Sequence, residues 1–220
     1  MLEIWGRKNS SNVIPVMWAV GELGLEHRRH NIGGSFGGDD TEEYVRLNPN
    51  RLIPTISDDG FVLWESMAIT RYLCRHYGLG TLFPSDDQQA ALADQWMDWY
   101  KSSITPNLMP IFVNLVRTPK PERNEEVIKR CTAATIGYLD LLDRHLQGKS
   151  YILGEHFSMG DIPLGAMLYK YYNLDIERPA LPNLEAWYAR LCERPAYQLH
   201  AMIPFGSSPQ EWLELEKAGA

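Results

Sequence analysis

The sequence predicts an α/β domain followed by an all-helical domain. Up to about Gly78, short strand-like and helix-like segments alternate in the order βαβ, then α, then ββα. After a connector at 79–85, apolar residues recur at spacings of three and four, which is typical of helices. Of the 220 residues, 45% are hydrophobic and 22% are charged, as in folded globular proteins. We therefore predict domains at 1–78 and 86–205 and a C-terminal tail at 206–220.

The sequence of the first half of the α/β domain predicts a strand, a helix and an edge strand, in that order. A short apolar run at 2–5 predicts a strand, and residues 13–23 predict a helix that stops at Gly24. The charged run at 26–31 suits a strand at the edge of a sheet. The polar residues just before the helix are candidates for its N-cap: Ser10, Ser11 and Asn12.

The second half of this domain reads as helix, hairpin and helix. Thr41 is preceded by two aspartates and predicts the start of a short helix that ends near Asn48. The Asp58-Asp59-Gly60 stretch between two apolar runs predicts a hairpin, and Ser66 predicts the N-cap of a helix through His76.

The C-terminal region reads as helices joined by short loops. A capping box is predicted at 157–162, in which the Ser158 hydroxyl bonds the Asp161 N–H and the Asp161 carboxylate reaches back. The tail is expected to be loosely held, with a short helix at 210–217. The other predicted helices span 86–104, 107–117, 122–146, 159–172, 183–193 and 195–201.

Charge, hydropathy and cysteine content exclude several functions. There are 21 basic and 28 acidic side chains, a net charge of −7, so we expect no nucleic-acid partner. No segment has the roughly 18 apolar residues of a membrane span, and the N-terminus lacks a secretory pattern, so a cytoplasmic protein is expected. Cys74, Cys131 and Cys192 form no C-x-x-C pair, and no histidine spacing predicts a metal site.

A glycine-rich stretch at 33–37 formally matches the G-x-S-x-G motif of serine hydrolases. That motif requires an apolar strand before the serine and a helix directly after it. Polar residues precede this stretch and Gly38-Asp39-Asp40 follow it, so a loop is the better interpretation.

Residues 48–54 and 64–69 together predict a binding site. Pro54 lies directly before a predicted strand, at a turn that tolerates a cis bond, and leaves the Ile53 backbone available to an extended ligand. Ser66 at a helix start can bind a carboxylate, and Glu65 can bind an ammonium group. The residues therefore suggest a peptide-like ligand carrying both charges, although Ser66 could serve only as a cap.

The chain resembles the cytosolic glutathione transferases over nearly its whole length. The resemblance rests on Ser10-Ser11-Asn12 between a strand and a helix, Asn48-Pro49 to Ile53-Pro54, Glu65-Ser66-x-Ala68-Ile69 and the Ser158 to Asp161 box. It is greatest with bacterial serine-type enzymes near the theta and delta classes, through residues 5–13 and Trp96-Met97-Asp98-Trp99. The resemblance implies a thioredoxin-like first domain, a homodimer, and glutathione as co-substrate without a metal.

The resemblance also implies roles for particular residues. Ser10 would donate a hydrogen bond to the glutathione sulfur, with Ser11 or Asn12 as alternatives. Such a bond favours the thiolate, which is the nucleophile, and lowering the thiol pKa by about two units is worth about 2.7 kcal/mol. The implied glutathione-binding residues are Leu52, Ile53, Pro54, Glu65 and Ser66.

The chain departs from the family pattern at Arg51 and Leu52. Relatives often have glycine at the position of Arg51. At the position of Leu52 they often have a polar side chain that binds the glycyl carboxylate of glutathione. Arg7 or Arg51 could bind that carboxylate instead. A small electrophile would bind among Trp5, Asn107, Met109, Pro110, Phe112, Val113 and Arg117, and Arg117 suggests an anionic substrate such as a haloacid.

Two alternatives to a transferase remain. One is a glutathione-dependent thiol–disulfide oxidoreductase, which the lack of a nearby cysteine disfavours, and the other is a non-catalytic binding module.

Overall fold

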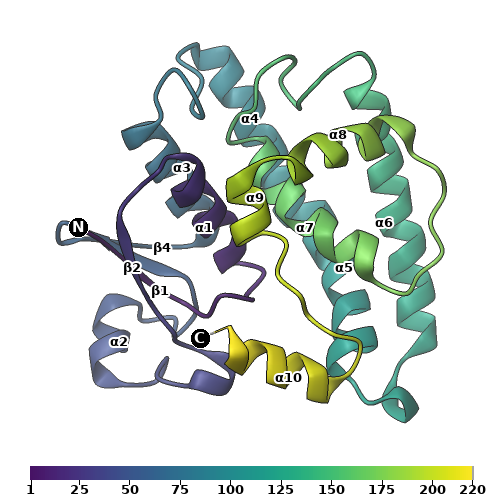
Figure 1. Ribbon diagram of the computed structural model, residues 1–220, viewed down its shortest axis with the longest axis horizontal. Helices are drawn as coiled ribbons and strands as arrows, with labels where there is room; N and C mark the ends of the chain where they lie inside the picture. The colour runs from purple at the N-terminus through teal and green to yellow at the C-terminus, as the bar shows by residue number, and fades with distance from the viewer. Residues whose placement is uncertain (220) are drawn as a thin grey trace.

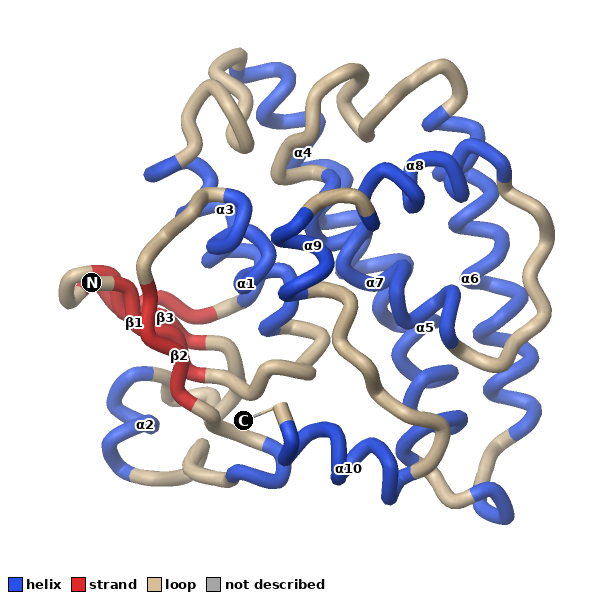
Figure 2. The backbone as a smooth tube through the Cα atoms, viewed as in Figure 1, coloured by secondary structure: helices blue, strands red, loops and turns tan. Residues whose placement is uncertain are grey.

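The computed structural model describes residues 1–219. Its four strands form one sheet at one side of the molecule, and helices make up the other side (Figure 1, Figure 2). The sheet order is β2-β1-β3-β4, with β1 and β2 parallel and β3 antiparallel to both β1 and β4. The strands are β1 (Leu2–Trp5), β2 (His27–His30), β3 (Thr55–Asp58) and β4 (Phe61–Trp64). The charged β2 lies at the sheet edge, as predicted.

The β3–β4 hairpin follows from its two turn residues. Asp59 and Gly60 have φ of 47° and 93°, and two-residue turns with both φ angles positive match the twist of the strands they join. Just before β3, the Ile53–Pro54 peptide bond is cis. The hairpin and the turn at Pro54 are therefore where the sequence placed them.

Helix α1 (Val13–Glu22) is shared by two hydrophobic cores. Val13, Val16 and Val20 pack toward the sheet with Ile4 and Ile56, whereas Ile14, Trp18 and Ala19 belong to the core of the helical domain. This explains why every residue from 13 to 20 is buried. Helix α3 (Ser66–Tyr77) packs beside α1, and α2 (Glu42–Leu47) lies on the other side of the sheet (Figure 1).

The second part of the chain is helical, with one difference from the predicted boundaries. Residues 87–117 are continuously helical: α4 (Asp87–Trp99), a π-helical turn η2 (Tyr100–Ile104), α5 (Thr105–Phe112) and a second π-helical turn η3 (Val113–Arg117). We expected a break near Pro106, but the helix continues through this proline, which follows directly on the π-helical turn η2. The remaining helices are η4 (Lys120–Glu122), α6 (Glu125–Leu146), α7 (Asp161–Asn173), α8 (Pro182–Cys192) and α9 (Pro195–His200).

The box before α7 is present, and Asp161 reaches back to the Ser158 N–H as predicted, but the bond of the Ser158 hydroxyl differs. The Asp161 carboxylate accepts hydrogen bonds from the Ser158 N–H at 2.9 Å and from the Ser158 hydroxyl at 3.2 Å. The hydroxyl therefore donates to the carboxylate, and the Asp161 N–H bonds the Ser158 carbonyl instead. The same carboxylate also accepts from the Ile152 N–H at 2.9 Å and from the Trp187 indole at 3.0 Å. Asp161 thus ties three segments of the helical domain together.

The C-terminal segment is not the loosely held tail that the sequence suggested. Helix α10 (Pro209–Ala218) runs back from the helical domain toward the α/β domain (Figure 1). Two of its side chains, Trp212 and Glu216, are buried. The helix itself was predicted at nearly these residues, but its packing depends on contacts with segments more than a hundred residues away.

Candidate functional site

A small hollow brings together all five residues that were expected to bind glutathione. Leu52, Ile53, Pro54, Glu65 and Ser66 line it together with Asn12, Asn48 and Asn50. Its volume of about 40 Å³ encloses only one end of a peptide-sized ligand. The rest of such a ligand would extend over the exposed side chains of Leu52 and Asn12.

The loop at 48–54 is held by buried polar side chains. The side-chain amide of Asn48 donates to the Leu52 carbonyl at 2.8 Å and to the Thr55 hydroxyl at 3.1 Å. Its side-chain oxygen accepts the Asn50 backbone N–H at 3.0 Å. The Tyr44 hydroxyl donates to the same Leu52 carbonyl at 2.6 Å. The register of β3 with β1 begins only at Thr55. Ile53 therefore presents its backbone at the hollow, outside the sheet pairing.

Glu65 and Ser66 meet the hollow at the N-terminus of α3. Glu65 has φ 75°, which is unusual for a residue with a Cβ, and such conformations cluster at functional sites. We expected Ser66 to be the N-cap, but Glu65 occupies that position and its side chain makes no capping bond. Ser66 is instead the first residue of the helix and is buried. The free N–H groups and positive dipole end of α3 favour an anion here.

The start of α1 also lacks a side-chain cap. We considered Ser10, Ser11 and Asn12 as caps, but α1 begins with no capping bond from its N-cap residue, Asn12. The three residues line a second cavity of about 130 Å³, and Asn12 lines both this cavity and the hollow at Ser66. Ser10 is the buried member of the three. A ligand spanning the two cavities would therefore pass directly over the start of α1.

The second cavity includes some, but not all, of the residues expected to contact an electrophile. Met109, Phe112 and Arg117 line it from α5 and η3. The others do not: Trp5 stacks on the His30 ring, Asn107 donates to the Ser103 carbonyl, the Pro110 carbonyl accepts from Asn114, and Val113 is exposed. Trp5 lies on β1, whereas Asn107, Pro110 and Val113 belong to the helical run that contains the two π-helical turns.

Sequence reasoning missed Asn9 and Trp212, which also line the second cavity, and suggested Arg7 only for the glycyl carboxylate. Trp212 belongs to α10 and packs against the Phe112 ring at 5.4 Å between centroids. Its amphipathic helix was visible in the sequence, but nothing there indicated which surface α10 covers.

Glu216 anchors α10 beside the second cavity. Its carboxylate lies 2.7 Å from Arg7 Nε and accepts the Ser35 N–H at 2.9 Å. Burial raises the pKa of Glu216, but the Ser35 hydrogen bond, the Arg7 charge and the neighbouring Asn9 amide outweigh burial and lower the pKa overall. Ser35 lies in the glycine-rich stretch, which forms a 3₁₀ turn, η1 (Gly34–Phe36), rather than the irregular loop expected. Its backbone therefore binds the C-terminal helix.

We expect Glu216→Gln to loosen α10 selectively. The folded-state pKa is below the ordinary value, so this carboxylate contributes stability at neutral pH that is lost as pH falls through the folded pKa. Backbone amides of α10 should exchange at least about tenfold faster in the variant at pH 7, as measured by hydrogen exchange. Glu214→Gln, at an exposed position of the same helix, is the control. Equal exchange in both variants would show that Glu216 does not anchor the helix.

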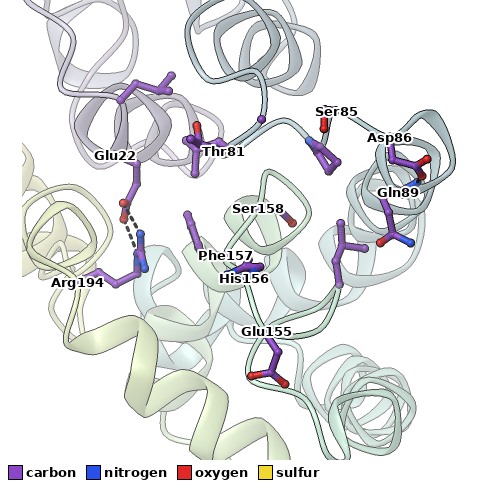
Figure 3. Close-up of a pocket in the computed structure, with 15 residues that line it drawn as sticks. Glu22, Thr81, Ser85, Asp86, Gln89, Glu155, His156, Phe157, Ser158 and Arg194 are labelled. Atoms are coloured by element: carbon purple, nitrogen blue, oxygen red, sulfur yellow. Dashed lines mark hydrogen bonds and ion pairs between the residues drawn. The ribbon is translucent and has the colours of Figure 1, made fainter.

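A larger cavity, about 780 Å³, is lined by Glu22 and Leu23 at the C-terminal end of α1, and Figure 3 shows its lining residues. Its lining includes none of the sequence-predicted site residues. Its polar groups already have structural roles: Glu22 accepts two bonds from the Arg194 guanidinium, and the Asp86 carboxylate caps α4. We therefore place the candidate site at the two smaller cavities.

No cysteine lines either of these cavities. Cys74 is buried in α3, and burial raises its pKa to about 12, which makes it a poor nucleophile. Within residues 1–219, no group of three or more metal-binding side chains is assembled. None of the helices in that range is long and apolar enough to cross a membrane.

Two protein-family models and several named proteins match this chain. Residues 9–76 match the family model of the glutathione S-transferase N-terminal domain, and residues 104–195 match that of the C-terminal domain. Glutathione S-transferase GstB of Escherichia coli is 35% identical over 93% of this chain and 99% of its own. Glutathione S-transferase D6 of Drosophila melanogaster is 30% identical over 85% of each chain.

A solved structure shows the same fold. The theta class glutathione S-transferase of Xanthomonas axonopodis pv. citri, with glutathione bound, has a TM-score of 0.89 and 43% identity, covering 93% of this chain and 99% of its own. The predicted fold, a thioredoxin-like domain followed by an all-helical domain, is thereby confirmed. The chain belongs to the glutathione S-transferase family and is a transferase.

Proposed function

We propose that this transferase binds glutathione across the two small cavities and activates its thiol for attack on a small electrophile. The observation that carries the proposal is the sharing of Asn12 between the hollow at Ser66 and the cavity at Ser10. One ligand can thereby reach both helix N-termini. The relative from Xanthomonas axonopodis pv. citri was solved with glutathione bound, which supports the same ligand here.

Each end of glutathione has a chemically matched partner in this proposal. The γ-glutamyl carboxylate binds the Ser66 hydroxyl and the free N–H groups of α3, and Glu65 binds its ammonium group. The backbone of Ile53 pairs with the cysteinyl residue in the manner of an added strand. The thiol then lies at the start of α1, where Ser10 donates a hydrogen bond to the sulfur.

The reaction is a nucleophilic attack by the thiolate. The sulfur forms a bond to the electrophilic carbon, and the leaving group departs with the electron pair of the bond that breaks. Ser10 keeps its proton and stabilises the negative sulfur before the attack. The positive dipole end of α1 also stabilises the negatively charged sulfur. Conjugation and dehalogenation both follow this scheme.

Calorimetric titration with glutathione tests the binding half of the proposal. Ser66→Ala removes a hydroxyl bond to a carboxylate, and we expect the Kd to rise about tenfold to a hundredfold. Ser102→Ala, on the exposed surface of η2, serves as the matched control and should leave the Kd unchanged. An unchanged Kd in Ser66→Ala would remove Ser66 from the site.

Two other functions, a thiol–disulfide oxidoreductase and a non-catalytic binding module, would require different features at the site. A thiol–disulfide oxidoreductase needs a reactive cysteine near the thiol, and neither cavity is lined by one. A non-catalytic module would bind glutathione without lowering the pKa of its thiol. The buried Ser10, which lines the second cavity, favours catalysis over this alternative.

We further propose that the protein is a homodimer. Strand β4 is an edge strand with the exposed apolar side chains Phe61, Val62 and Trp64, and Tyr77 at the end of α3 is also exposed. Exposed apolar groups on a sheet edge are typical of a surface that pairs with another chain. Sedimentation equilibrium would distinguish a dimer from a monomer.

A further inference from the structure

Lys170 of α7 is buried without a carboxylate partner. The residue is 2% exposed, and its ammonium group forms no ion pair with a carboxylate of residues 1–219. The ring centroids of Phe112 and Phe205 lie 5.5 and 6.0 Å from its Nζ. Aromatic faces attract a cation but do not neutralise it. Buried charges are normally paired, so the fold leaves a positive charge whose counter-ion is missing.

The unpaired charge lies next to the second cavity. Phe112 lines this cavity, and the guanidinium groups of Arg7 and Arg117 line it as well. No carboxylate belongs to its lining, and the nearby Glu216 is already engaged with Arg7. Burial, followed by the Arg7 charge, lowers the pKa of Lys170 to about 8, so the side chain remains largely protonated at neutral pH. The cavity is therefore surrounded by excess positive charge.

A buried amide in the same cavity has unused hydrogen-bonding capacity. Asn9 is 4% exposed and lines the cavity. It lies close enough to Glu216 to lower the pKa of that carboxylate. The amide nitrogen faces that carboxylate without a hydrogen bond of good geometry, and the amide oxygen has no partner within residues 1–219. Buried polar groups without partners are rare, and a ligand group with an acceptor oxygen would satisfy the amide N–H.

From this arrangement we infer that the electrophile carries a compact anionic group, a carboxylate, and that Lys170 selects for it. This inference rests on the function proposed above. Lys170 acts by its charge across the Phe112 ring, as a specificity-determining residue, whereas Arg117 and Asn9 are placed to contact the anion. The cavity volume of about 130 Å³ equals roughly four water molecules, enough for a small haloacid.

The positive charge also serves the reaction itself. In the reaction with a haloacetate, the glutathione thiolate forms an S–C bond to the methylene carbon, the carbon–halogen bond breaks, and halide leaves with its electron pair. Two negative species must approach each other, and their repulsion is large in a low dielectric. A fixed cation beside the carboxylate offsets that repulsion. The same cation offers less benefit to a neutral electrophile.

Chloroacetate and chloroacetamide form a matched pair of electrophiles that tests the inference, because they have the same leaving group and nearly the same size. We expect the ratio of kcat/KM for chloroacetate to kcat/KM for chloroacetamide to fall at least tenfold in Lys170→Met. Lys129→Met removes the same charge from an exposed position of α6 and should leave the ratio unchanged. A purely structural role of Lys170 would lower both kcat/KM values together and keep their ratio.

Competition in the wild-type protein gives a second measurement that needs no variant. Acetate should inhibit the chloroacetamide reaction at a concentration at least tenfold lower than acetamide does. Equal inhibition, or an unchanged ratio in Lys170→Met, would overturn the anionic preference while the proposed function stands. If the wild type reacts with neither chloroacetate nor chloroacetamide, both the anionic preference and the proposed function are overturned.

Discussion

In Ser10→Ala, the thiol of bound glutathione should titrate near its free pKa of about 8.5, roughly two units above the wild-type complex. Ser10 is buried at the start of α1 and lines the cavity there. In the proposed complex, its hydroxyl donates to the sulfur that lies in this cavity. At pH 6.5 the thiolate fraction would fall from about a half to about one per cent, so we expect kcat/KM to fall about fiftyfold.

An ultraviolet difference titration of the glutathione complex measures the thiolate directly. Ser11→Ala and Asn12→Ala are the matched controls, since both positions line the same cavity. If the pKa of the glutathione thiol stays low in Ser10→Ala but rises in Ser11→Ala or Asn12→Ala, the donor to the sulfur is the residue whose replacement raises that pKa. If saturating glutathione gives no thiolate signal in the wild type, the chain is a binding module and not the proposed catalyst.

Asp161→Ala should destabilise the helical domain by about 4 kcal/mol. The substitution leaves four buried donors without their acceptor: the N–H groups of Ile152 and Ser158, the Ser158 hydroxyl and the Trp187 indole. Each unsatisfied buried donor costs about 1–3 kcal/mol, partly offset by relaxation and water entry. Urea denaturation measures the difference. Asp140→Ala, on α6 with an exposed ion pair to Arg144, should cost less than about 1 kcal/mol.

The pH dependence of stability gives a second test of Asp161. Burial raises the pKa of this carboxyl to about 6, although the four hydrogen bonds lower it. Because the folded-state pKa exceeds the ordinary value of 3.8, the folded protein binds the proton more tightly. The contribution of Asp161 is therefore largest below about pH 4 and declines as pH rises to about 6. Asp161→Asn should lack this decline, and a parallel pH profile in both proteins would contradict the assignment.

Local sequence signals predicted the elements of the α/β domain well. The charged run at β2 marked an edge strand, and Asp58-Asp59-Gly60 marked a hairpin, although Asp58 is the last residue of β3 and not part of the turn. Both features depend only on residues close in sequence. The residues of the hollow at Ser66 were also identified from sequence. They lie on two short segments whose turn and helix start could be placed without knowing the rest of the fold.

Capping was predicted less well, for a physical reason. Serine and asparagine before a helix are good caps, yet neither α1 nor α3 has a side-chain cap, whereas Thr41 does cap α2. Both helix starts that meet the candidate site are uncapped, although α7, α8 and α9 also begin without a side-chain cap. A helix N-terminus that binds a ligand must leave its N–H groups free, and the sequence alone does not distinguish the two uses.

The sequence by itself determined the order of strands and helices along the α/β domain, the turn at Pro54 and the family to which the chain belongs. Only the tertiary structure decided which residues surround the electrophile. Met109 and Phe112 of α5 line the second cavity while Asn107 and Pro110 do not, and α10 brings Trp212 to it from the far end of the chain. Lys170 lies on a buried helix, where its charge is unexplained until the cavity beside Phe112 is seen. These placements depend on long-range packing, which spacing along one chain does not encode.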